Sequence, residues 1–373
     1  MELYVVGGWV RDTLLKNEGY DIDPQDRDWV VVGSTPEEMV SKGFIPVGKG
    51  FPVFLHPKTH EEYALARTER KISHGYKGFD FYTGKNVTLE EDLLRRDLTI
   101  NAIACDKNHS FIDPYNGIED LHKKILRHVS PAFREDPVRL LRLARFAARF
   151  PDFQIAPETL CFSQEIVSSG EADALVPERI FQELTRALGE KKPSRFFEVL
   201  KESGYLSRVF PNWHVPSEVT QILDEPLPAD IRFGLSFAFV PAPEVKAICL
   251  QLRTSAEFQE IAYLSALFRD SVVQAQWQSD LILETLTRLD ALRRPERFTK
   301  IIQVLQRERP EVCSRRWLSL SSAISHIDNW ALMRTLHHPS EMQEALKKKR
   351  LEVIQEVLDS GIKEISQLPS EQG

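Results

Sequence analysis

Two aspartates in front of an apolar run are the residues of this sequence best suited to chemistry. Asp26 and Asp28 enclose Arg27, and the apolar run at positions 29–32 is typical of a buried strand. If the strand begins at Asp26, its period of two residues places both carboxylates on one face. Carboxylates aimed at one point repel each other unless cations lie between them, and such oxygen ligands favour Mg²⁺ shared with substrate phosphates. The pattern predicts a two-metal catalytic site, although such a pair standing alone is more often a surface turn.

Two segments carry groups that suit a phosphate-rich ligand. Gly7-Gly8 stand between a strand pattern and a helix with Arg11, where glycines allow close backbone approach and the helix N-terminus attracts anions. A tight strand-to-helix turn is the alternative interpretation of these glycines. Arg95-Arg96 stand next to a stretch that we expect to be helical, with Asp97 and Asn101 on one face. The forked donors of arginine suit a triphosphate.

A third segment places arginines at regular spacing on a predicted helix. Arg139, Arg142 and Arg145 recur every three residues, and the buried side of this helix is expected to consist of Leu140, Leu143, Ala144 and Ala147. No acidic residue lies between the arginines. We therefore expect the three guanidinium groups to bind an anion.

In this order, the segments resemble the class II tRNA nucleotidyltransferases of the polymerase-beta-like superfamily. Residues 5–12 match the opening motif of that family, Asp26 and Asp28 match its metal-binding pair, and residues 95–102 and 135–145 match its RRDxTxNA and EDxxRxxRxxRF motifs. The resemblance covers roughly residues 1–210 and fades beyond them. It implies a base-selecting pair, Asp136 and Arg139, and further nucleotide contacts at Gly8, Arg11, Arg96, Arg142 and Arg145.

The resemblance also implies an α+β architecture. A mixed α/β nucleotidyltransferase head at residues 1–112 is expected to be followed by an all-α neck for base recognition at 113–150, a tRNA-binding helical body at 151–224 and a helical tail at 225–373. Strand-like runs crowd the first part of the chain, and amphipathic helical patterns replace them from about residue 117. The implied activity is template-independent addition and repair of the 3′-terminal CCA of tRNA from CTP and ATP, with Mg²⁺.

The tail departs from the longer bacterial relatives, which carry a phosphohydrolase domain with an adjacent His-Asp pair. The similar context at residues 230–239 lacks that pair, so we expect a degenerate phosphohydrolase-like region without hydrolase activity. Metal ligands supplied elsewhere, for instance by His326, His337 or His338, are the alternative.

Three other functions stay open at this stage. A poly(A) polymerase shares the motifs but tends to be longer, with a basic C-terminal extension. Enzymes that add only CC or only A are close relatives, although residues 67–79 resemble the loop of enzymes that complete CCA. A non-catalytic RNA-binding scaffold would be expected to have lost an acidic ligand or an arginine, and Asp26, Asp28, Arg96 and Arg142 are all present.

The composition and net charge limit the kinds of partner that this protein is expected to bind. The net charge of −7 argues against a protein that grips nucleic acid over its whole surface, so tRNA is expected to bind in a local groove. No apolar run is long enough to cross a membrane, and the N-terminus begins as a strand instead of a signal peptide. We expect a cytoplasmic protein without a membrane partner, and the sequence leaves its oligomeric state open.

Overall fold

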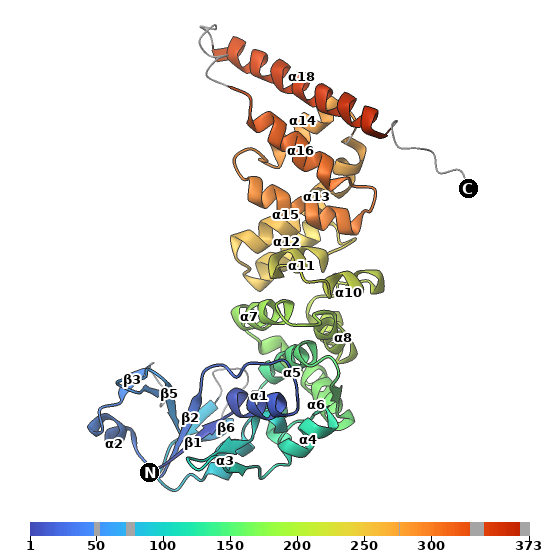
Figure 1. Cartoon of the computed structure of the whole chain (residues 1–373). Helices are drawn as coiled ribbons and strands as arrows, with labels where there is room; N and C mark the ends of the chain where they lie inside the picture. The colour runs from blue at the N-terminus through green and yellow to red at the C-terminus, as the bar shows by residue number, and fades with distance from the viewer. Residues whose placement is uncertain (48–52, 72–78, 276, 329–338, 366–373) are drawn as a thin grey trace. The chain divides into compact units, whose positions relative to one another are not determined.

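The computed structural model describes residues 1–47, 53–71, 79–275, 277–328 and 339–365 (Figure 1). The chain divides into two compact units, residues 1–211 and 212–373. The finer division into head, neck, body and tail stays a prediction. Residues 72–78 of the loop predicted at 67–79, together with His337 and His338, lie outside the described residues.

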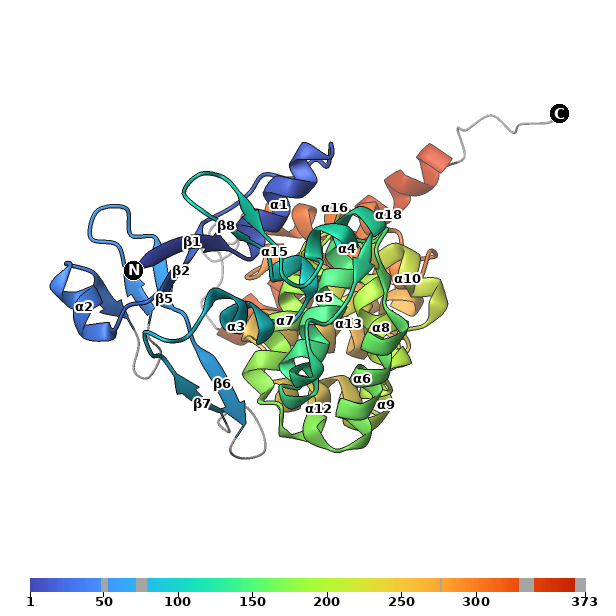
Figure 2. The same ribbon diagram turned by 90° about the horizontal axis from the view of Figure 1, so that it is seen from below.

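A seven-stranded mixed sheet forms the framework of the first unit. Its strand order is β3-β4-β5-β2-β1-β8-β9, with β1 antiparallel to both of its neighbours and β2 parallel to β5. Figure 2 shows β1, β2 and β5 of this sheet next to one another. The bounds are β1 Glu2–Val6, β2 Asp28–Val32, β3 Ile45–Val47, β4 Val53–Leu55, β5 Glu62–Leu65, β8 Ala104–Cys105 and β9 Phe111–Ile112. A separate hairpin consists of β6 Thr68–Lys71 and β7 Phe79–Tyr82.

Both faces of this sheet are buried, because neighbouring residues of β2 point to opposite sides. Val30 packs in one apolar cluster with residues of α3 Leu89–Leu94, and Val31 packs in another with Met39 of α2 Pro36–Ser41. The strand patterns before Gly7 and at residues 29–32 correspond to β1 and β2. The Thr35 hydroxyl caps α2 by accepting a hydrogen bond from the amide of Glu38 at 3.3 Å.

The expected start of β2 is wrong. The strand begins at Asp28, which pairs with Val6, the last residue of β1, while Asp26 and Arg27 belong to the preceding loop. The alternation argument therefore does not place the two carboxylates on one face. The expected helix at Asp97 to Asn101 is also wrong, because these residues form only a single 3-10 turn, η1 Thr99–Asn101.

Helices make up most of the rest of the first unit. The central one, α5 Val138–Arg149, packs against α7 and α8, and its predicted apolar face is confirmed by the complete burial of Leu140, Leu143, Ala144 and Ala147. A short parallel pair, β10 Ile125–Leu126 with β11 Gln154–Ile155, corrects the expectation that strands end near residue 117. The remaining elements are α1 Gly8–Asn17, α4 Gly117–Lys123, η2 Pro131–Glu135, α6 Pro157–Ser168, η3 Glu171–Ala174, α7 Pro177–Leu188, α8 Ser194–Glu202 and α9 Tyr205–Val209.

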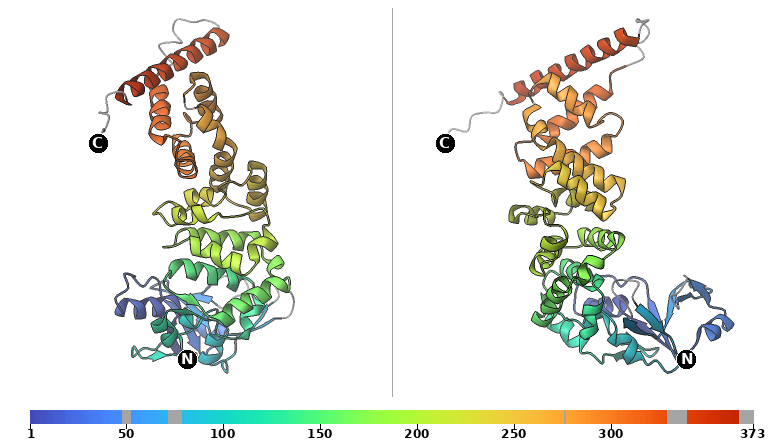
Figure 3. Two further views of the ribbon diagram at one scale, coloured as in Figure 1. Left: turned by 90° about the vertical axis from the view of Figure 1, so that its right-hand side faces the viewer. Right: turned by 180° about the vertical axis from the view of Figure 1, so that it is seen from behind.

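The second unit is helical throughout its described residues (Figure 3). One apolar cluster of this unit includes the fully buried Trp317. None of the described helices combines the length and apolarity needed to cross a membrane. Its helices are α10 Ser217–Leu223, α11 Ala229–Leu235, α12 Ala242–Leu252, α13 Ala256–Ala275, α14 Ser279–Arg288, α15 Pro295–Glu308, α16 Ser314–Ser325 and α18 Pro339–Ile365. A mixed sheet followed by helices confirms the α+β class.

Candidate active site

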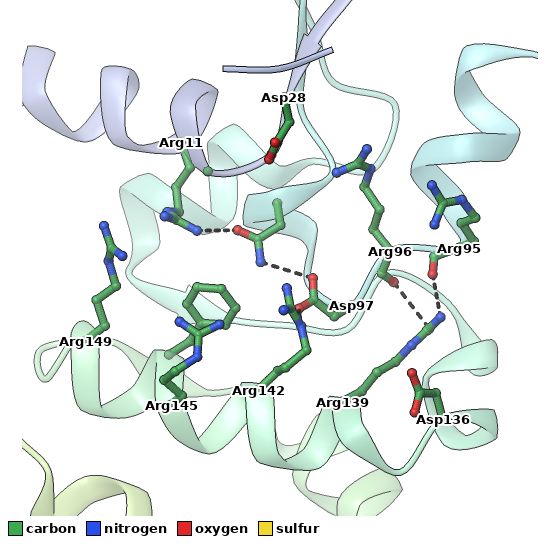
Figure 4. A pocket seen from close by; sticks show the side chains of 14 residues that line it. Arg11, Asp28, Arg95, Arg96, Asp97, Asp136, Arg139, Arg142, Arg145 and Arg149 are labelled. Carbon is green, nitrogen blue, oxygen red and sulfur yellow. Dashed lines mark hydrogen bonds and ion pairs between the residues drawn. The ribbon is translucent and has the colours of Figure 1, made fainter. Parts of the chain in front are cut away.

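A cavity of about 400 Å³ in the first unit gathers the predicted nucleotide-binding residues (Figure 4). Its walls come from the start of α1, the start of β2, the segment after α3, and α5. We call it the arginine cavity, because seven arginines and three aspartates line it. The lining residues are Gly7, Gly8, Arg11, Asp28, Arg95, Arg96, Asp97, Asn101, Asp136, Arg139, Arg142, Arg145, Phe146 and Arg149.

The two glycines keep one wall of the arginine cavity open. Gly7 has a φ of +71° and caps α1, a backbone conformation that favours glycine. A Cβ atom on Gly7 would lie 3.3 Å from Nη1 of Arg96, and one on Gly8 would lie 3.6 Å from Nη2 of Arg11. A larger residue at Gly7 would be strained by its backbone and would crowd Arg96, whereas a Cβ at Gly8 would make only an ordinary contact with Arg11.

A chain of hydrogen bonds links α1 to α5 across the cavity floor. Arg11 Nη1 donates to Asn101 Oδ1 at 2.5 Å, Asn101 Nδ2 donates to Asp97 Oδ1 at 3.1 Å, and Arg142 Nε donates to Asp97 Oδ2 at 2.7 Å (Figure 4). Burial opposes ionisation of Asp97, but Arg142 and Asn101 hold the pKa of its carboxyl well below its usual range. The η1 turn therefore fixes the position of two arginines on different helices.

Acidic partners from distant segments also hold the deeper arginines. Arg145 Nε donates to Glu183 Oε2 on α7 at 2.7 Å, and Arg149 donates to Asp12 on α1 at 2.8 Å. No acidic residue lies between the α5 arginines in the sequence, but the fold brings carboxylates to them from α7 and α1. Glu183 lies 38 residues from Arg145 in the sequence, so no local sequence pattern predicts this ion pair.

Asp92 on α3 positions the arginine pair that precedes the η1 turn. Its fully buried carboxylate accepts from Arg95 Nη2 at 2.7 Å, from Arg96 Nη2 at 3.2 Å and from the Arg67 amide at 3.2 Å. Burial raises the pKa of Asp92, but the two arginines outweigh it and the net shift is downward. The Nε atom of Arg96 is buried and lacks a partner among the described atoms, and the residue itself lines the arginine cavity.

Asp136 and Arg139 lie together at the outer end of α5 (Figure 4). Arg139 donates to the carbonyl oxygens of Arg95 at 2.6 Å and Arg96 at 3.4 Å, which use two of its five N–H donors. Asp136 Oδ1 accepts from the amide of Val138 at 3.0 Å. These contacts fix the direction of both side chains within the cavity wall.

Asp28 stands where the arginine cavity meets a second hollow. This carboxylate hollow, of about 580 Å³, is lined by Trp9, Gln25, Asp26, Arg27, Asp28, Thr59, His60, Glu61 and Glu62. Sequence reasoning missed Glu62, which pairs with Asp28 in the register of β2 and β5. Burial raises the pKa of Asp28, and the charges of Glu62 and Asp26 add to the shift, while Arg96 opposes it.

The donor set fits a hard divalent cation. Asp26 and Asp28 line one hollow and repel each other, and a cation between them would relieve that repulsion. No group of three or more His, Cys, Asp or Glu side chains within the described ranges is arranged to hold a metal. A magnesium ion bound through two carboxylates, with its other ligands from water and substrate phosphates, matches this arrangement.

The family models that match this chain agree with the nucleotide-binding character of the site. The poly(A) polymerase head domain model matches residues 3–127, and the model described as a probable RNA and SrmB-binding site of polymerase A matches residues 152–215. The sheet, the arginine cavity and these matches define a nucleotidyltransferase of the poly(A) polymerase head class.

Comparison with curated relatives identifies the family within that class. The CCA-adding enzyme of Coxiella burnetii strain RSA 331 is 46% identical over 368 residues, which cover 96% of each chain. The chain belongs to the CCA-adding enzyme family. The match extends well past residue 210, where the motifs had suggested that the resemblance fades.

Solved structures share the fold. The Thermotoga maritima CCA-adding enzyme complexed with tRNA superimposes with a TM-score of 0.66 at 21% identity, covering 96% of this chain and 91% of that one. A CCA-adding enzyme in complex with CTP gives a TM-score of 0.68 at 21% identity, with 98% and 91% covered.

Proposed function

We propose that this protein adds and repairs the 3′-terminal CCA of tRNA, using CTP and ATP and releasing pyrophosphate. Membership of the CCA-adding enzyme family supports the reaction. The observation that carries the proposal is a cavity with seven arginines that opens onto Asp28, because it provides a triphosphate site beside a catalytic carboxylate. With tRNA and nucleoside triphosphates as substrates, the proposed setting is the cytoplasm.

The reaction joins two substrates at the carboxylates. The 3′-hydroxyl oxygen of tRNA forms a bond to the α-phosphorus of the nucleotide, and the hydroxyl proton passes to solvent. The bond from that phosphorus to the bridging oxygen breaks, and pyrophosphate leaves with the electron pair. Arg96, Arg142 and Arg145 would bind the triphosphate, and Gly8 would allow its close approach. Arg11 is tied to Asn101 and would hold the floor of the site in place.

Asp26 and Asp28 would hold the Mg²⁺ ions of this site. Bound magnesium would favour ionisation of the attacking hydroxyl and neutralise charge on the departing pyrophosphate. Replacing either aspartate removes one of the carboxylates that the cation requires. Neither residue belongs to the apolar clusters of the sheet, so such changes should leave folding largely intact.

Asp136 and Arg139 would select the base. A carboxylate only accepts hydrogen bonds and a guanidinium only donates them, so together they form an edge of fixed sense. Cytosine (N4 amino, N3) and adenine (N6 amino, N1) fit that edge. Uracil and guanine present a carbonyl and an N–H in the reversed order, which would leave buried polar groups unpaired at about 1–3 kcal/mol each.

Incorporation into tRNA lacking its CCA end tests this function. The purified full chain is incubated with that tRNA, Mg²⁺ and each labelled nucleoside triphosphate alone and in pairs, and products are resolved at single-nucleotide length. We expect two C residues with CTP, then one A when ATP is added. Arrest after CC or addition of A alone would assign a partial activity, long A tails would assign a poly(A) polymerase, and no incorporation would contradict transfer altogether.

A further inference from the structure

The carboxylate hollow differs in chemistry from the arginine cavity that it meets at Asp28. Its lining contains one arginine and four carboxylates, from Asp26, Asp28, Glu61 and Glu62. Glu61 and Glu62, which lie outside the proposed metal pair, would repel a triphosphate, whereas hydroxyl groups can donate hydrogen bonds to them. A terminal ribose presents two adjacent hydroxyls and a single phosphate. The lining therefore suits the end of an RNA chain better than a free nucleotide.

An aromatic and cationic pair forms another part of the same hollow. The guanidinium carbon of Arg27 lies 4.8 Å from the centroid of the Trp9 ring, within the range of a cation–π contact. Within the described residues, the ion pairs do not include one made by Arg27, which is exposed. Tryptophan rings and planar guanidinium groups are the surfaces on which unpaired RNA bases stack.

The chain positions of this pair connect it to both substrates. Trp9 directly follows Gly8, which lines the arginine cavity, and Arg27 lies between Asp26 and Asp28. A base that stacks here would bring its ribose beside the carboxylates, and among the residues that the structure describes Asp28 is the one that lines both spaces. The two hollows thus provide separate places for a nucleotide and for the group that attacks it.

On the basis of the proposed function, we infer that the carboxylate hollow holds the 3′-terminal nucleotide of tRNA, with its base stacked on the Trp9–Arg27 pair. The ribose hydroxyls face Asp26, Asp28 and Glu62, and the 3′-oxygen lies next to the arginine cavity. Trp9 and Arg27 are then positioning residues for the acceptor. They have no role in binding CTP or ATP.

Kinetics of Trp9→Ala, with Trp9→Phe as the matched aromatic control, test this assignment. KM for tRNA lacking CCA, KM for CTP and kcat are measured on the full chain. Loss of one base stack should raise the tRNA KM about tenfold, while the CTP KM stays within about twofold and Trp9→Phe restores most of the loss. An unchanged tRNA KM in Trp9→Ala would overturn the assignment, and so would a rise confined to the CTP KM.

A crosslinking experiment on the unaltered chain covers the case in which Trp9→Ala fails to fold. A tRNA lacking CCA carries a photoreactive base at its last nucleotide, and the crosslinked peptide is identified by mass spectrometry. We expect the crosslink at Trp9 or Arg27, and a crosslink confined to other segments would overturn the assignment. If the kinetic or the crosslinking result contradicts this assignment but the unaltered protein still adds CCA, the proposed function stands. If the unaltered protein does not incorporate nucleotides, the proposed function itself is refuted.

Discussion

Buried arginines occur in both units, but their donors have different partners. Arg269 in the second unit donates through Nε to Glu308 at 2.8 Å and through its two other nitrogens to the carbonyl oxygens of Val240 and Phe237 at 3.2 and 3.0 Å. In the first unit, Arg96 keeps a buried Nε without a partner among the described atoms, and it lines an open cavity. Ion pairing alone therefore does not separate a structural arginine from a ligand-binding one. What differs is the setting of the two residues, because Arg269 is enclosed by Glu308 and two backbone carbonyls, whereas Arg96 lines a cavity together with six other arginines.

Arg269→Ala should give the largest effect and should affect stability alone. It would leave the buried Glu308 carboxylate unpaired, and breaking such a pair costs about 3–5 kcal/mol. Burial already raises the pKa of Glu308, and a carboxyl with a raised folded pKa loses stability as the pH rises through that pKa. Urea unfolding should therefore show a larger deficit at pH 8 than at pH 5. If the folded variant bound CTP more weakly, Arg269 would also affect the nucleotide, and the contrast between the two units would be wrong.

Arg142→Ala should affect the nucleotide. Loss of a charged hydrogen bond to a phosphate, about 2–3 kcal/mol, lowers kcat/KM for CTP roughly 30- to 150-fold. Asp97→Asn is the matched control, because it weakens the ion pair at 2.7 Å but keeps the guanidinium. If Asp97→Asn lost as much CTP activity as Arg142→Ala, the pairing itself would account for the effect, and direct phosphate binding by Arg142 would be refuted.

Asp136→Ala should give the smallest change in rate but a distinct change in selectivity. The carboxylate that accepts the amino group of cytosine or adenine would be lost, so discrimination against UTP and GTP should fall at least about tenfold while some transfer of CMP persists. Single-nucleotide incorporation with each triphosphate measures this ratio. If the variant kept its full selectivity, groups other than the Asp136 carboxylate would distinguish the bases.

The sequence was informative where function depends on local spacing. The resemblance of the motifs to one family assigned Asp28, Gly8, Arg139, Arg142 and Arg145 to one site, and these residues line one cavity. Short-range periodicity accounts only for the three arginines, because α5 places every third residue on a slowly turning stripe.

Partners distant in the sequence could not be predicted in the same way. Asp97 contacts an arginine 45 residues away, and Glu183 contacts one 38 residues away, so only the packing of α5 against the η1 turn and α7 brings them together. Glu62 was missed because its neighbour Asp28 is reached through the parallel pairing of β2 with β5. The start of β2 was misplaced by two residues, since the end of β1 decides where pairing stops.

Binding and transfer by Asp28→Ala provide the most direct test of the account. Asp28 lines both hollows, whereas the proposed function assigns the affinity for the triphosphate to the arginines. Equilibrium titration with CTP and single-turnover transfer of CMP to tRNA lacking CCA are compared for the variant and the unaltered protein at matched Mg²⁺. The account predicts a CTP Kd within about threefold of the unaltered value and a transfer rate lower by at least about a thousandfold. Near-normal transfer by Asp28→Ala would contradict it.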